Sequence, residues 1–471
     1  MKLVYNVSDR PKAGQIIVFA LQQLLAILAA TIAVPAIVGN GMSQSAALFG
    51  AGVGTLVYLV LTKFRSPVFL GSSFAFLSSM FAAFAGGVSA SLGYLGMIIG
   101  AVMAGLVYVI IAIVIRFAGA GWVNKLMPAV IIGPTVAIIG LSLSGNAVLN
   151  SLGYANAGEA LVDANGSYIV NLSTGVNLIV ALVTLTVIIV CSVYGRKMAK
   201  MIPFIIGICA GYAVALCFTL IGNSANIDAL KILDFTAFKD MKWIPGFTFL
   251  TAFGGNYDYG TVGSMGKYIA AIAVAYVPVA FVVFAEHIAD HKNLSSIIEA
   301  DLLEDPGLHR TLLGDGIGSM AGAFFGGCPN TTYGESVGCV AISGNASVIT
   351  TVATAILAIV ASFIAPFTTF LATIPYCVMG GVCITLYGFI AVSGLKMLQK
   401  VNLDSNRNLF PASIILICGV GGLKLLFGSI TITSIAVALI LGILANVILA
   451  KGEKAPAAKA GEKEPEAEKK E

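Results

Sequence analysis

Long apolar stretches recur along almost the whole chain and leave little of it to form a surface that faces water. Of the 471 residues, 58% are hydrophobic and only 10% are charged, whereas soluble globular proteins carry about 25% charged residues. This balance excludes a soluble enzyme, a nucleic-acid-binding protein and a disordered chain, and it predicts an all-α polytopic membrane protein. The fourteen candidate spans are 14–38, 43–62, 67–86, 91–115, 123–145, 174–194, 201–222, 268–289, 312–328, 331–344, 346–370, 375–395, 408–426 and 430–450.

The distribution of Lys and Arg predicts that both termini lie in the cytoplasm. Positive residues concentrate in cytoplasmic loops, and with residues 1–13 as a cytoplasmic N-terminus the loops alternate regularly. The segment 451–471 has no core-forming residues, so we expect a disordered cytoplasmic tail. The predicted location is the plasma membrane. Five of the 26 basic residues would lie outside: Lys231, Lys239, Lys242, Lys267 and Lys424.

Two pairs of segments suggest that the chain contains an internal repeat. LMPAVIIGP (126–134) is similar to TIPYCVMGG (373–381), and GSSFAF (71–76) is similar to NTTYGE (330–335). With seven spans in each half, the halves would have opposite topology, as in transporters whose site lies at the midplane between inverted repeats. The alternative is chance similarity, because Gly, Ser and Pro are common in membrane helices.

The segments 71–76 and 330–335 carry hydroxyl and small residues inside the third and tenth spans. Non-helical backbone at membrane depth is tolerated where it is paired or lines a cavity. We therefore expect two short extended segments that face each other. Half-helices that start after them would direct their positive dipole ends at the centre.

Four acidic residues lie in or beside apolar stretches. Glu286 and Asp290 are four residues apart on one helix face, and Glu335 follows the second extended segment. A carboxylate at the bilayer centre needs a partner, a proton or water, which indicates a functional role. The alternative is that such an acid has a structural role and bonds to backbone or hydroxyl groups. Among Glu286, Glu335 and Asp290, this alternative is strongest for Asp290. Asp315 is expected near the surface, at a helix end.

The histidines and cysteines do not suggest a metal centre. His287 is expected to pack or to bond to a neighbour, whereas His291 and His309 are expected to face solvent. The H-E-x-x-H order is absent, and none of the eight cysteines forms a C-x-x-C pair. The sequence therefore predicts no metal, no cofactor and no enzyme activity.

These parts indicate a small, planar, polar and uncharged ligand. Carboxylates accept N–H bonds, extended backbone offers both donors and acceptors, and aromatic faces stack. The best stacking candidates are Phe74, Phe76, Tyr333 and Tyr387. A pyrimidine such as uracil fits this description, but the argument does not separate it from a purine.

Four motifs resemble one known family. GSSFAF (71–76), AEHIADH (285–291), PNTTYGESVG (329–338) and LYG (386–388) are similar to segments of the nucleobase–ascorbate transporter (nucleobase:cation symporter-2) family and, within it, of the bacterial uracil permeases. The resemblance covers residues 8–450. It implies a uracil:proton symporter that imports uracil by alternating access.

The resemblance also implies how the chain is divided. A core domain would hold spans 1–4 (14–115) and spans 8–11 (268–370). A gate domain would hold spans 5–7 (123–222) and spans 12–14 (375–450). A homodimer through the gate domains is a further expectation, with uracil, protons and membrane lipid as the other partners and no nucleic acid.

Carried over by motif, the resemblance implies specific site residues. Glu286 and Glu335 would bind the uracil edge, and the backbone amides of Phe74 and Gly334 would bind its carbonyl oxygens. The remaining pocket residues would be Ala30, Tyr333 and Tyr387. Glu286 and Asp290 would serve proton coupling, because desolvation and mutual repulsion favour a proton on one of them. Some relatives have His at the position of Asp290.

Three other functions stay open. A xanthine or purine permease of the same family is the closest alternative. An anion transporter of the same fold usually carries a cytoplasmic domain larger than 451–471. A channel would not need two acids at the midplane.

Overall fold

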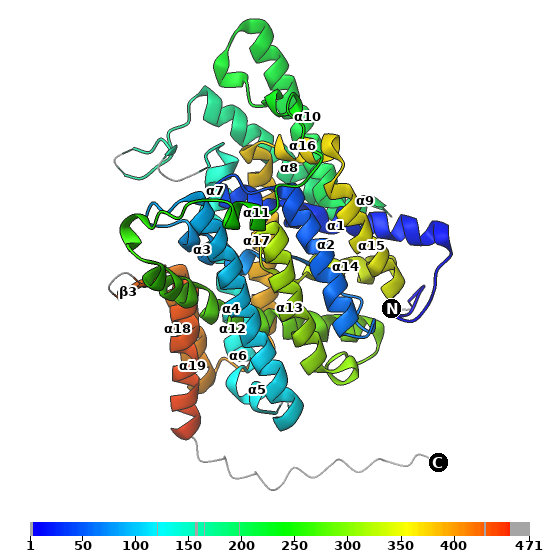
Figure 1. Ribbon diagram of the computed structural model, residues 1–471, viewed down its shortest axis with the longest axis vertical. Helices are drawn as coiled ribbons and strands as arrows, with labels where there is room; N and C mark the ends of the chain where they lie inside the picture. Colours follow the sequence, from blue (N-terminus) through cyan, green and yellow to red (C-terminus); the bar gives the residue numbers. More distant parts are fainter. Residues whose placement is uncertain are drawn as a thin grey trace, which may run out of the picture.

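The computed structural model describes residues 3–119, 121–155, 159–163, 165–196, 198–427 and 430–452, so most of the predicted tail lies outside the described residues. The chain is mostly helical, and the helices form one bundle (Figure 1). The helices of the first half are α1 (Ala13–Val38), α2 (Gln44–Leu61), α3 (Leu77–Ala83), α4 (Ala90–Ala118), α5 (Gly121–Leu126), α6 (Ala129–Ser142), α7 (Ser144–Ser151), α8 (Leu172–Tyr194), α9 (Met198–Met201) and α10 (Pro203–Ala225). Those of the second half are α11 (Thr248–Phe253), α12 (Met265–Ile298), α13 (Leu308–Gly326), α14 (Gly334–Ser343), α15 (Val348–Ser362), α16 (Ala365–Ala372), α17 (Tyr376–Leu398), α18 (Asn406–Val420) and α19 (Ser434–Gly452).

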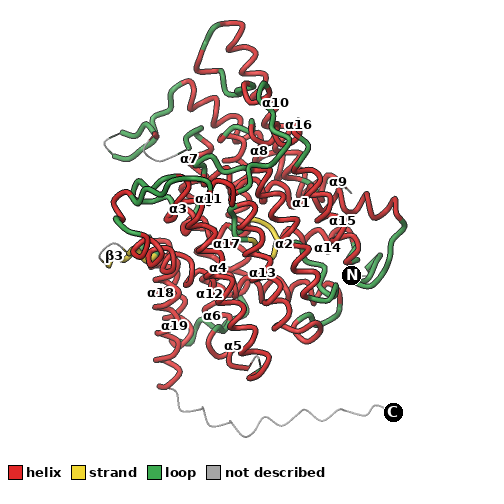
Figure 2. The backbone as a smooth tube through the Cα atoms, in the orientation of Figure 1, coloured by secondary structure: helices red, strands yellow, loops and turns green. Residues whose placement is uncertain are grey.

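Two three-residue strands cross in the middle of the bundle. β1 (Leu70–Ser72) pairs antiparallel with β2 (Asn330–Thr332), with Leu70 opposite Thr332. Figure 2 shows this pair in yellow among the helices. The two strands lie in the segments that the sequence predicts to be extended and facing, so that prediction is confirmed. A second pair, β3 (Leu425–Phe427) and β4 (Ile430–Ile432), lies at the edge.

The helices pack in two groups that meet around the β1–β2 pair. One group contains α1, α2, α4, α12, α13 and α15, which pack mainly with one another. The other contains α6, α7, α8, α10, α17, α18 and α19. Contacts between the groups run chiefly from α1 and α12 to α6, α10, α17 and α19. The first group consists of helices from residues 13–118 and 265–362, and the second of helices from residues 129–225 and 376–452.

Small residues allow close packing where α2 meets α13. A Cβ built on Gly50 would lie 2.5 Å from the carbonyl oxygen of Gly322, and one on Gly54 would lie 2.7 Å from that of Gly318. Such contacts let two membrane helices approach at the level of their backbones. The side-chain amide of Asn330 donates to the carbonyl of Gly50 at 3.0 Å, which fixes β2 against this helix pair.

By length and composition, eight of the described helices suffice to cross a membrane: α1, α2, α4, α6 with α7, α8, α10, α12 and α17. The pair α15 and α16, bent by 83°, makes a ninth if it is counted as one span. The remaining expected spans correspond to shorter pieces, such as β1 with α3 and β2 with α14. The structure is thus a polytopic helical bundle, and the number of fourteen stays a prediction.

Two matched positions of the suspected repeat have the same local role. Pro128 and Pro375 are the N-caps of α6 and α17, both in extended conformation. Proline fits this place because its missing N–H would have no intrahelical partner there. The two helices then pack against each other.

Candidate functional site

A cavity of about 420 Å³ lies where β1 and β2 cross, between the two groups of helices. Its size is within the range of sites that hold small molecules. Six residues that the sequence predicts for the site line it: Phe74, Glu286, Asp290, Tyr333, Gly334 and Glu335. Other polar residues on its wall are Ser192, Lys200, Asn293, Thr331, Thr332 and Ser393.

The crossing strands are held from both sides by buried side chains. The hydroxyl of Thr55 accepts from the N–H of Leu70 at 2.9 Å, which ties β1 to α2. The hydroxyl of Ser336 accepts from the N–H of Phe69 at 3.2 Å and from the amide of Gln23 at 3.0 Å. Backbone that would otherwise be bare at membrane depth therefore has partners.

Three carboxylates converge on the cavity. Glu286 and Asp290 come from adjacent turns of α12, and Glu335 lies in the first turn of α14. The hydroxyl of Thr332 donates to Asp290 at 2.7 Å. A carboxylate in a first helical turn is stabilised by the helix dipole. The site therefore offers acceptors for N–H groups of a ligand, with Lys200 the lysine among its described lining residues.

Two helical segments begin at the cavity without a side-chain cap. The 3₁₀ turn Phe74–Phe76 follows β1, and α14 follows β2 with Tyr333 as its N-cap. N–H groups of a first helical turn have no intrahelical acceptor and bind electronegative ligand atoms well. The backbone at Phe74 and Gly334 is thus suited to carbonyl oxygens of a ligand.

Tyr333 fills the space next to β1. Its hydroxyl donates to the carbonyl of Ser72 at 2.8 Å, and its side chain is 4% exposed. A Cβ built on Gly71 would lie 2.3 Å from two carbons of the Tyr333 ring. The ring can take this place only because residue 71 is glycine.

Three predicted aromatic or small residues lie behind the cavity wall. Ala30 and Tyr387 are 1% and 2% exposed and are not among the described residues that line the cavity. Tyr387 packs edge to face on Phe74, with ring centroids 5.6 Å apart. Phe76 stacks instead on Tyr276, at 5.5 Å. Phe74 and Tyr333 are the predicted aromatic side chains on the wall itself.

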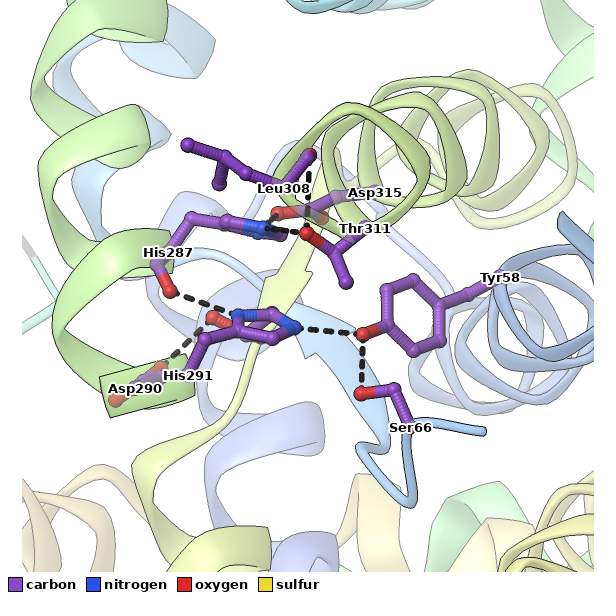
Figure 3. A network of polar contacts seen from close by, with 9 residues as sticks. Tyr58, Ser66, His287, Asp290, His291, Leu308, Thr311 and Asp315 are labelled. Atoms are coloured by element: carbon purple, nitrogen blue, oxygen red, sulfur yellow. Dashed lines mark hydrogen bonds and ion pairs between the residues drawn. The ribbon is translucent and has the colours of Figure 1, made fainter. Parts of the chain in front are cut away.

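Two predictions about polar residues near α12 are wrong. Asp315 is fully buried rather than near the surface, and its carboxylate lies 2.7 Å from Nδ1 of His287 (Figure 3). His291 is also fully buried rather than solvated. The reason is that α12 continues to Ile298, so residue 291 still lies in its packed part. The expectation that His287 bonds to a neighbour is confirmed.

Comparison with known proteins identifies the family. The profile of the Permease family matches residues 14–427. The uracil permease of Bacillus caldolyticus is 40% identical over 452 residues, which cover 95% of each chain. The uracil permease of Bacillus subtilis (strain 168) is 38% identical over 96% of this chain and 97% of its own. That of Escherichia coli (strain K12) is 34% identical over 94% of this chain and 93% of its own. These relatives are named as permeases, not as enzymes.

Solved structures with the same fold are membrane transporters. The transmembrane domain of the cyanobacterial bicarbonate transporter BicA superposes with a TM-score of 0.60 at 15% identity, over 95% of this chain and all of that one. The murine anion transporter Slc26a9 in its inward-facing state gives a TM-score of 0.65 at 10% identity, over 94% of this chain and 69% of that one. Sequence identities this low show similarity of fold alone. The family profile and the relatives establish that the chain is an integral membrane protein of the permease family.

Proposed function

We propose that this chain imports uracil across the plasma membrane as a uracil:proton symporter. The observation that carries the proposal is the cavity at the strand crossing, where Glu286 and Glu335 meet two helix starts that lack side-chain caps. The rim of uracil alternates N–H donors and C=O acceptors, which is the complement of this set. Three relatives of this chain, 34–40% identical to it, are named uracil permeases.

In the proposed complex each edge of uracil has a partner of opposite polarity. Glu286 and Glu335 accept the N–H groups, and the backbone amides of Phe74 and Gly334 donate to the carbonyl oxygens. The ring of Tyr333 flanks the base. Ala30 and Tyr387 lie behind the cavity wall and do not touch the base. The Tyr387 ring packs on Phe74 and holds that side chain in position.

Proton coupling is assigned to Glu286 and Asp290. The two acids are one turn apart on α12 beside the cavity, so a negative charge on either disfavours a charge on the other. One carboxyl would take up a proton outside and release it inside. Uracil is neutral, so each cycle would carry positive charge inward and would be assisted by the membrane potential.

The proposal includes alternating access, in which two groups of helices move against each other as rigid bodies and expose the site to one side of the membrane at a time. We interpret the α1–α2–α4–α12–α13–α15 group as part of the core domain and the α6–α7–α8–α10–α17–α18–α19 group as part of the gate domain of a fourteen-span protein. Lys200 and Asn293, on the side assigned to the cytoplasm, line the cavity and are exposed. The cavity would therefore open inward, with both termini cytoplasmic and a homodimer formed through the gate domains.

Uptake of labelled uracil into membrane vesicles tests the function. We expect saturable uptake that excess unlabelled uracil blocks and xanthine does not. Glu286→Gln and Glu335→Gln should each weaken binding roughly ten- to a hundredfold, because each loses a charge-assisted bond of about 1.5–3 kcal/mol. Glu304→Gln, at an exposed position, is the matched control. Competition by xanthine at equal strength would assign the chain to purines instead, and unsaturable flux would indicate a channel.

A further inference from the structure

The face of α12 that points away from the cavity carries a buried polar network (Figure 3). His291 lies with its Nε2 2.7 Å from the hydroxyl of Tyr58 in α2. A second bond of 2.7 Å joins that hydroxyl to Ser66, in the segment that leads into β1. Tyr58, Ser66 and His291 are all 0% exposed. These side chains are not part of the cavity wall, and the proposed transport function does not use them.

Counting donors and acceptors shows which atom of His291 can accept a hydrogen bond from Tyr58. Nδ1 of His291 is 2.8 Å from the backbone carbonyl of His287, which can only accept, so Nδ1 carries the hydrogen. In the neutral ring Nε2 is then an acceptor, and Tyr58 donates to it. The Tyr58 hydroxyl also lies within hydrogen-bond distance of the Ser66 oxygen, at 2.7 Å. Loss of the Tyr58 hydroxyl therefore leaves Nε2 of His291 and the Ser66 hydroxyl without this partner.

The same part of α12 is bonded on its opposite side. Asp290 precedes His291, and successive residues of a helix point about 100° apart. Asp290 accepts from Thr332 of β2 at 2.7 Å, while His291 is held by α2. Ser66 leads into β1, and β1 pairs with β2. The Thr332–Asp290 bond and the His291–Tyr58–Ser66 contacts therefore both connect α12 to the β1–β2 pair.

We propose that Tyr58 and His291 are positioning residues that fix the rotation of α12 and so direct Glu286 and Asp290 into the cavity. Without the Tyr58–His291 bond, α12 keeps the bond from Thr332 to Asp290 and, one turn earlier, the contacts of His287 with Asp315 and Thr311, but it loses the bond that fixes residues 290–298 against α2. Glu286 lies a little more than one turn before His291 and moves with it. The inference rests on the proposed binding of uracil by Glu286, and it adds two residues that never touch the ligand.

The first test is Tyr58→Phe, which removes one oxygen and keeps the ring. We expect the dissociation constant of purified protein for uracil to rise about tenfold, while the maximal uptake rate changes less than twofold. Tyr108→Phe is the matched control. Tyr108 is also buried and packs edge to face on His287, 6.3 Å between centroids, but its hydroxyl has no partner among the described residues. Equal affinity in the two variants would overturn the proposal.

A double variant separates positioning from simple stability. Tyr58→Phe with His291→Leu removes the acceptor as well as the donor, so less polar surface is buried without a partner and the unfolding temperature should recover. The affinity for uracil should stay low, because the bond to α2 is still missing. Recovery of both quantities would mean that the bond serves stability alone.

Hydrogen exchange tests, without any ligand, whether the Tyr58–His291 bond holds α12 in place; we call this bond the clamp. Amides of residues 286–298 should exchange faster in Tyr58→Phe than in Tyr108→Phe, while those of α4 stay unchanged. Faster exchange with no uracil binding by the unmodified protein would uphold the clamp and refute the proposed function. Equal exchange in the two variants would refute the clamp whatever the substrate is.

Discussion

Replacing Gly71 by Ala tests how closely the strand crossing is packed. The new Cβ would lie 2.3 Å from Cε2 and Cζ of Tyr333 and 2.8 Å from its hydroxyl oxygen. An ordinary carbon–carbon contact is about 3.5–4 Å, so the ring must move by about 1 Å or more. The ring is buried, and a shift of that size breaks its 2.8 Å bond to the carbonyl of Ser72.

The expected cost combines two contributions. Overpacking of a well-packed interior costs about 1–3 kcal/mol, and a lost intramolecular hydrogen bond costs about 0.5–1.5 kcal/mol. We therefore expect Gly71→Ala to lower the free energy of unfolding by about 2–4 kcal/mol. Because Tyr333 is the N-cap of α14, its displacement also moves Gly334 and Glu335. Uracil affinity should fall about tenfold or more, which corresponds to about 1.4 kcal/mol.

The assay is reversible unfolding in detergent together with equilibrium binding of labelled uracil. Gly388→Ala is the control, since a Cβ at that helical position meets nothing within 4 Å. The double variant Gly71→Ala with Tyr333→Leu should regain part of the stability and none of the affinity, because the smaller side chain removes the clash but not the loss of the ring. A Gly71→Ala protein as stable as Gly388→Ala would refute the packing argument.

Three further predictions concern transport. Uptake should rise as the external pH falls, collapse with a protonophore and stay unchanged when choline replaces sodium; strong sodium dependence would refute proton coupling. Asp290→Asn should make uptake insensitive to pH while binding weakens only slightly, which parallel pH profiles of uptake and binding would show. A cysteine in place of Phe389, which lines the cavity and is 56% exposed, should react with a thiol reagent at a rate that uracil changes, and an unchanged rate from both sides would argue against alternating access.

The strand crossing could be predicted from sequence because its signal is chemical. Gly71 and the hydroxyl residues that follow it are unusual inside an apolar stretch, and Asn330, Thr331 and Thr332 repeat the pattern. Such residues have a reason to lie at membrane depth only if their backbone is paired or faces a ligand. The same reasoning identified Glu286 and Glu335, which both reach the cavity.

The network behind α12 could not be predicted, because its members are far apart in the chain. Tyr58 and His291 are 233 residues apart, and nothing near either residue indicates the other. His291 follows Asp290 at the apparent end of an apolar stretch, so the sequence suggested solvent. Beyond residue 291 the helix stays buried because Leu294 and Ile298 pack in a cluster with Tyr58, and this packing, not local composition, decides that residue 291 is buried.

The pairing of β1 with β2 has a consequence for how the protein is made. Tyr333 and Ser72, which bond across the crossing, are 261 residues apart. While the ribosome is still synthesising the second half, β1 has no strand to pair with. Its polar backbone groups then depend on water or on the membrane-insertion machinery for hydrogen bonds. The first half therefore cannot reach its final form alone, and contacts this distant are slow to form. A chain that stops before residue 330 should remain a target for quality-control proteases, although it already contains several complete membrane helices.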